Sequence, residues 1–80
     1  MVFQLLLFGI TKDIIGNSPF EFNLQGENTA GNLMKQLSSQ YPTLTELNSI
    51  ALAVNGAYAT NDTIINEGDE IALIPPVSGG

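Results

Sequence analysis

One helix-like stretch stands between strand-like segments, and this order limits the possible fold more than any other feature of the chain. Leu33, Leu37 and Tyr41 recur every four residues, so they lie on one face of a helix. Thr29 is a suitable N-cap, and Pro42 ends the stretch. Because a single helix covers only one face of a sheet, the pattern predicts an α+β fold with one main helix packed on a sheet.

Strand-like segments precede and follow this helix. The expected strands are residues 2–10, 20–24, 50–54, 57–59 and 70–75. We expect residues 12–18 to connect the first two strands, and residues 62–65 to form a short connector with a single helical turn. Asn55 and Gly56 predict a hairpin turn, because both tolerate a positive φ.

The first and last strands both have the apolar character of central strands, so we expect them to pair and to make the sheet mixed. In that arrangement Leu6 and Phe8 lie beside Ala72 and Ile74, on the face away from the helix. We interpret these four residues as an exposed apolar patch that docks partner proteins. A covering loop, or a strand shifted by one residue, would remove the patch.

The composition excludes most self-contained catalytic sites. The 80 residues include neither cysteine nor histidine, which removes thiol nucleophiles, disulfides, the usual general base and ordinary zinc sites. Glu67, Asp69 and Glu70 are close in sequence, but we interpret them as a solvated acidic turn and not as a metal site. We therefore expect the chain to bind no cofactor and no metal.

The chain is acidic, with two basic and eight acidic residues and a net charge of −6. Such a chain is not attracted to nucleic acid or to anionic lipid, and it is steered towards basic clefts on other proteins. A role of the charge in solubility alone explains it equally well. Residues 5–8 are too short an apolar run to span a bilayer, and residues 1–4 lack the basic start of a signal peptide, so we expect a cytoplasmic location.

The last five residues form a tail-like segment. We expect a domain over residues 1–75 and a flexible tail over residues 76–80, because Pro75 and Pro76 cannot continue strand pairing. Gly79 has no side chain, so the carboxylate of Gly80 can pass through a narrow channel and be activated in the active site of another enzyme. The alternative is a frayed end that carries two glycines by chance.

Three segments together carry a family likeness. Residues 68–72 read GDEIA and residues 75–80 read PPVSGG, while residues 53–56 read AVNG. In these segments, and more loosely over its whole length, the chain resembles the small subunits of molybdopterin synthase. It departs from that family at Gly31, which we expect to weaken the first helical turn by about 1 kcal/mol relative to alanine.

The resemblance implies a ubiquitin-like β-grasp fold and a role in sulfur transfer. An adenylating enzyme of the ubiquitin-activating type would use ATP to activate Gly80, which then becomes a thiocarboxylate. The tail would enter the large catalytic subunit of molybdopterin synthase, where the sulfur passes to a cyclic pyranopterin precursor in molybdenum cofactor biosynthesis. The other tail residues that would contact partners are Pro75, Pro76, Val77 and Ser78, with Gly79 giving clearance.

The same resemblance places the catalytic side chains on the partners, so the chain is expected to be a sulfur-carrying subunit and not an enzyme on its own. Three alternatives remain open. A sulfur carrier of the thiamine pathway has the same fold and tail but usually lacks the Pro-Pro-Val-Ser stretch. A ubiquitin-like modifier would join its tail to lysines, and a plain interaction module would have an inert tail.

Overall fold

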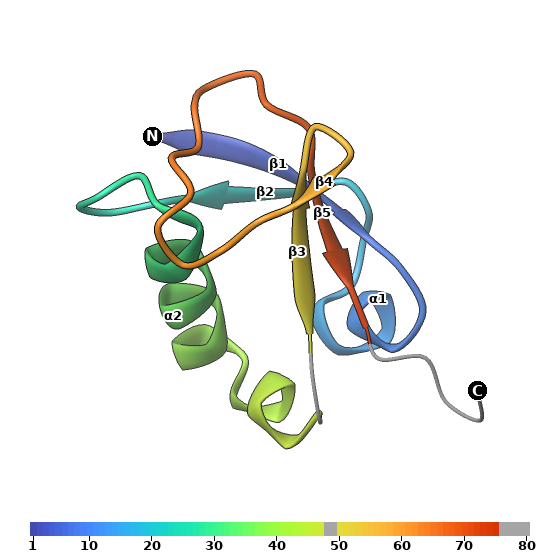
Figure 1. Ribbon diagram of the computed structural model, residues 1–80. Helices are drawn as coiled ribbons and strands as arrows, with labels where there is room; N and C mark the ends of the chain where they lie inside the picture. The colour runs from blue at the N-terminus through green and yellow to red at the C-terminus, as the bar shows by residue number, and fades with distance from the viewer. Residues whose placement is uncertain (48–49, 76–80) are drawn as a thin grey trace.

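Five strands form one mixed sheet in the computed structural model, which describes residues 1–47 and 50–75 (Figure 1). Their order across the sheet is β2-β1-β5-β3-β4. The strands are β1 (Val2–Leu7), β2 (Phe20–Asn23), β3 (Ala51–Val54), β4 (Ala57–Tyr58) and β5 (Ile71–Ile74). The central pair β1 and β5 is parallel and every other pair is antiparallel, so the predicted pairing of first and last strands is confirmed.

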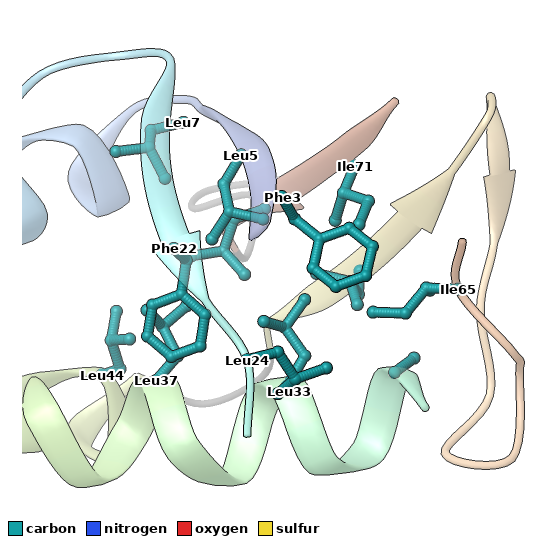
Figure 2. Close-up of a cluster of buried hydrophobic side chains, with 13 residues drawn as sticks. Phe3, Leu5, Leu7, Phe22, Leu24, Leu33, Leu37, Leu44, Ile65 and Ile71 are labelled. Carbon is teal, nitrogen blue, oxygen red and sulfur yellow. The ribbon is translucent and has the colours of Figure 1, made fainter. Parts of the chain in front are cut away.

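The core lies between the sheet and helix α2 (Ala30–Gln40), which covers one face of the sheet (Figure 1). Figure 2 shows the buried side chains of Phe3 and Leu5, on alternate positions of β1, above Leu33 and Leu37 of α2. The backbone N–H of Asn32 donates to the hydroxyl of Thr29 at 3.2 Å, which confirms the predicted N-cap. The helix ends one residue before Tyr41, and a 3₁₀ helix, η1 (Pro42–Glu46), follows.

The predicted connection over residues 12–18 is wrong in part, because a short helix, α1 (Ile10–Ile15), occupies it. The first strand also ends at Leu7 and not at residue 10. The reason is the buried hydroxyl of Thr11, which accepts from the Phe8 N–H at 3.1 Å and donates to the Phe8 carbonyl at 2.6 Å. Because Thr11 satisfies both backbone groups of Phe8, the chain turns into α1 instead of continuing the strand.

Residues 62–65 form no helical turn, contrary to the prediction. They run beside the start of α2, where the loop between β4 and β5 passes the first helical turn in Figure 1. The Ala30 N–H donates to the Thr63 carbonyl, and the Ile65 N–H donates to the Asn28 carbonyl, each at 2.9 Å. The first N–H groups of a helix lack partners within the helix, so a loop that supplies carbonyl groups is favoured over a local helical turn.

This loop explains Gly31. The Gly31 N–H donates to the Asn61 carbonyl at 3.0 Å, and a Cβ atom at position 31 would lie only 2.9 Å from that oxygen. Glycine is a weak helix former, as the sequence predicts, but it is the residue that allows the loop to approach this closely. The packing requirement therefore outweighs helix propensity at this position.

We predict that Gly31→Ala destabilises the fold by about 1–3 kcal/mol, because the new methyl group must displace the loop. Helix propensity alone predicts a gain of about 1 kcal/mol, so the two effects have opposite signs. Chemical denaturation measures the change, with Ser39→Ala on the exposed side of α2 as the control. A more stable Gly31→Ala variant would contradict the close contact.

The hairpin of β3 and β4 is tied to the start of β5. Asn55 and Gly56 have φ of 52° and 85°, which confirms the predicted turn. The Asn55 side chain accepts from the Glu70 N–H at 2.9 Å and donates to the Asp69 carboxylate at 3.1 Å. The Asn66 N–H donates to the same carboxylate at 2.8 Å. These hydrogen bonds, from Asn66 first and from Asn55 second, hold the pKa of Asp69 below its ordinary value of 3.8.

This lowered pKa predicts a pH dependence. The ionised Asp69 stabilises the folded state above its unfolded pKa, and that contribution is lost as the pH falls through the lower folded pKa. The stability difference between the wild type and Asp69→Asn should therefore be largest near neutral pH and shrink below about pH 4. Urea denaturation of both proteins at several pH values measures it. A difference that stays constant down to pH 2 would show that the charge of Asp69 does not contribute.

Candidate functional site

The face of the sheet away from α2 carries the predicted apolar patch. Leu6 pairs in register with Ala72, so their side chains lie side by side, and both are half-buried. Ile74 follows on the same face of β5 and is also half-buried. Phe8, just after β1, leaves half of its surface exposed. The structure thus brings together the four residues that the sequence predicts, and no described segment covers them completely.

A shallow hollow of about 310 Å³ lies in this face. Its floor consists of Ala53 on β3 and Ala72 on β5, which pair directly across the two strands. Because an alanine side chain ends at Cβ, two adjacent alanines leave space between the larger side chains around them. The residues that line the hollow are Phe8, Ala53, Gly56, Tyr58, Glu70, Ala72 and Ile74.

Several of these residues are missing from the sequence prediction. The sequence analysis places Tyr58 only in an expected strand and interprets Glu70 as part of a solvated acidic turn, and both residues line the hollow. Tyr58 pairs with Ala53, and its side chain is 76% exposed. The Asn55-Gly56 turn could have placed Tyr58 opposite Ala53, but the sequence does not reveal that β3 pairs with β5.

The chain leaves the sheet next to this face. Strand β5 ends at Ile74, and the half-buried Pro75 lies beside Gly9 in the turn between β1 and α1. The strand stops one residue before the predicted end at residue 75, because proline has no N–H for pairing. Pro76, Val77, Ser78, Gly79 and Gly80 lie outside the described residues. Their roles, and the boundary between domain and tail, stay predictions.

A second hollow, of about 570 Å³, lies at the start of α2 and is polar. The Asn32 side-chain amide in this hollow already has partners, since it donates to the carbonyls of Gln25 and Glu27 at 2.8 and 2.7 Å. Among residues 1–47 and 50–75, no three His, Cys, Asp or Glu side chains gather to hold a metal ion. The helices in that part of the chain are also too short or too polar to cross a membrane. The candidate site is the open, apolar face, where exposed side chains border a hollow.

Comparison with known proteins matches almost the whole chain to one family. The model of the ThiS family matches residues 5–80. The molybdopterin synthase sulfur carrier subunit of Dictyostelium discoideum is 42% identical, over 98% of this chain and 95% of that protein. The protein of the same name from Mycobacterium tuberculosis is 36% identical, over 96% of this chain and 95% of its own length.

Solved structures agree with this similarity. The crystal structure of SAMP1, small archaeal modifier protein 1, from Haloferax volcanii matches with a TM-score of 0.80 and 27% identity, over the full length of both chains. A chain from the complex of subunits 1 and 2 of molybdopterin-converting factor from Helicobacter pylori matches with a TM-score of 0.66 and 27% identity, also over both full lengths. The predicted ubiquitin-like β-grasp fold is therefore confirmed.

Proposed function

The chain belongs to the ThiS family, and from this premise we propose that it is the sulfur carrier subunit of a molybdopterin synthase. The observation that supports this most is the 42% identity, over nearly full length, to a protein of that name. The ending PPVSGG supplies the required terminal group, the carboxylate of Gly80. The open sheet face supplies a surface on which larger partners can dock.

The proposed chemistry requires a partner enzyme to activate the carboxylate. The Gly80 carboxylate attacks the α-phosphate of ATP in an adenylating enzyme, and pyrophosphate leaves. Hydrosulfide from the sulfur donor then attacks the acyl carbon and displaces AMP, which gives a thiocarboxylate on Gly80. In the large subunit the thiocarboxylate sulfur forms a bond to a carbon of the pyranopterin precursor and displaces an oxygen substituent from that carbon. Water then cleaves the carbonyl–sulfur bond, which leaves the sulfur on the precursor and restores the carboxylate. This chain contributes position and access, because Gly79 and Gly80 have no side chains that obstruct a narrow channel.

Docking is proposed to use the patch of Leu6, Phe8, Ala72 and Ile74. Exposed apolar side chains gathered on one face typically mark a protein interface. Ile74, the last residue of β5, lines the hollow in this face, so a partner that covers the face lies next to the end of the strand. The complex of two subunits from Helicobacter pylori is a precedent for such a hetero-oligomer among the structural matches.

The similarity to SAMP1, a small archaeal modifier protein, favours a second candidate function. In that function the activated Gly80 would form an isopeptide bond with a lysine of another protein. Both functions begin with adenylation and differ in the acceptor, which is sulfur in one and an amine in the other. Lysine-linked conjugates in an extract that contains the wild type, and their absence with a Gly80 deletion, would favour the modifier.

We predict that the chain gains sulfur when it is incubated with ATP, a sulfur donor and its adenylating enzyme. Intact-mass spectrometry should show the replacement of one oxygen by sulfur, because only the terminal carboxylate is activated. A chain that lacks Gly80 is the control and should gain nothing. If the enzyme loads its own known carrier but leaves this chain unchanged, the proposed function is wrong.

A charge on the patch is expected to abolish docking without unfolding the domain. Phe8→Glu places a carboxylate on a half-exposed site, so its thermal midpoint should stay close to that of the wild type. Its affinity for the large subunit should fall about 30-fold or more, as for other interface hot spots. Val2→Glu is the matched control, because Val2 is exposed on the same face at the other end of β1. If Phe8→Glu binds the large subunit as tightly as the wild type does, this patch is not the docking surface.

A further inference from the structure

We propose that the hollow in the open sheet face binds an arginine side chain of the large subunit. This inference rests on the proposed function, because it names the group on that partner which the site recognises. It concerns a single feature of the interface, the space above Ala53 and Ala72, and goes beyond the apolar patch around it. Three properties of the hollow support it: its shape, its charge and its exposed aromatic rings.

The shape suits a long, narrow side chain. The alanine floor is bounded by larger side chains, with Tyr58 on the β4 side and Phe8 and Ile74 towards the end of β5. A volume of about 310 Å³ holds one large side chain. The hydrocarbon part of an arginine buries well against methyl groups such as those of Ala53 and Ala72, while its charged end remains free to pair.

The charge of the hollow selects a cation. Glu70 is the charged member of its lining, and no basic residue lines it. The two basic residues of the chain, Lys12 and Lys35, lie on α1 and α2, away from this hollow. An apolar partner side chain would leave the carboxylate of Glu70 covered and unpaired, which costs free energy. A basic partner side chain pairs with it instead.

The backbone of Glu70 is held in place before the partner arrives. Its N–H donates to the Asn55 side chain at 2.9 Å, and the Asn55 N–H donates to the Glu70 carbonyl at 2.7 Å. The backbone of Glu70 is thereby held against the hairpin turn. A carboxylate on a fixed backbone loses less conformational entropy on binding, so the pair contributes more to affinity.

The aromatic rings favour arginine over lysine. Tyr58 is 76% exposed, and half of Phe8 is exposed, although both rings line the hollow. A planar guanidinium stacks on such rings and also pairs with a carboxylate through two parallel hydrogen bonds. A lysine ammonium offers neither the stacking plane nor the paired geometry.

The test compares Glu70→Gln with Glu21→Gln in binding to the large subunit from the same organism. Glu21 is exposed on β2 and faces Gln4 across the same side of the sheet, so both variants lose one charge from one face. Titration calorimetry should show that Glu70→Gln lowers the affinity about tenfold or more. The loss should be similar at low and at high salt, because the docked partner shields the pair of Glu70 and arginine from solvent. Glu21→Gln should change the affinity less than threefold.

Tyr58 and the partner provide a second measurement. Tyr58→Phe should bind like the wild type because it keeps the ring, while Tyr58→Ala should bind more weakly. Each interface arginine of the large subunit is then changed to lysine. One of these arginine changes should lower the affinity for wild-type carrier but have little further effect on the affinity for the Glu70→Gln carrier. That result identifies the arginine that pairs with Glu70.

The outcomes separate this inference from the proposed function. If the wild type binds the large subunit but Glu70→Gln binds as tightly as Glu21→Gln, only the arginine site is wrong. The same holds if no arginine of the partner is coupled to Glu70. If the wild type does not bind the large subunit at all, the proposed function fails together with the arginine site.

Discussion

The parallel pairing of β1 with β5 is the constraint on which the rest of the structure depends. It aligns Leu5 with Ile71 and Leu6 with Ala72, so alternate residues of both strands face opposite sides of the sheet. One side becomes the core beneath α2, and the other becomes the open face. A shift of one residue would exchange the two sides, bury the patch and expose the core.

The same pairing connects the fold to the proposed function. The last strand lies in the middle of the sheet, between β1 and β3, and the chain leaves it through Pro75 beside the open face. A rigid central strand therefore precedes the terminal residues that would carry sulfur. The hairpin of β3 and β4 adds Ala53 and Tyr58 to that face, and the hydrogen bonds of Asn55 hold this hairpin to the start of β5.

Local signals in the sequence predicted much of the fold. Helix periodicity, the Thr29 cap and the Asn55-Gly56 turn depend on neighbours in the chain, and each is confirmed. The errors have both local and distant causes. The segment before residue 18 forms α1 because Thr11, three residues along the chain, satisfies the backbone of Phe8. Residues 62–65 form no helical turn because α2 needs partners for its first N–H groups. Gly31 disfavours a helix locally but is required by a loop thirty residues later.

The sequence by itself determined the fold class, the residues that alternate between core and open face on β1 and β5, and the family likeness carried by the ending PPVSGG. These follow from periodicity and short motifs, which act over a few residues. Only the tertiary structure decided that β3 lies beside β5, and therefore that Ala53, Tyr58 and Glu70 surround one hollow. Strand neighbours are chosen by the packing of the whole core, so no local pattern in the chain could have shown that these three residues join Phe8, Ala72 and Ile74 at that site.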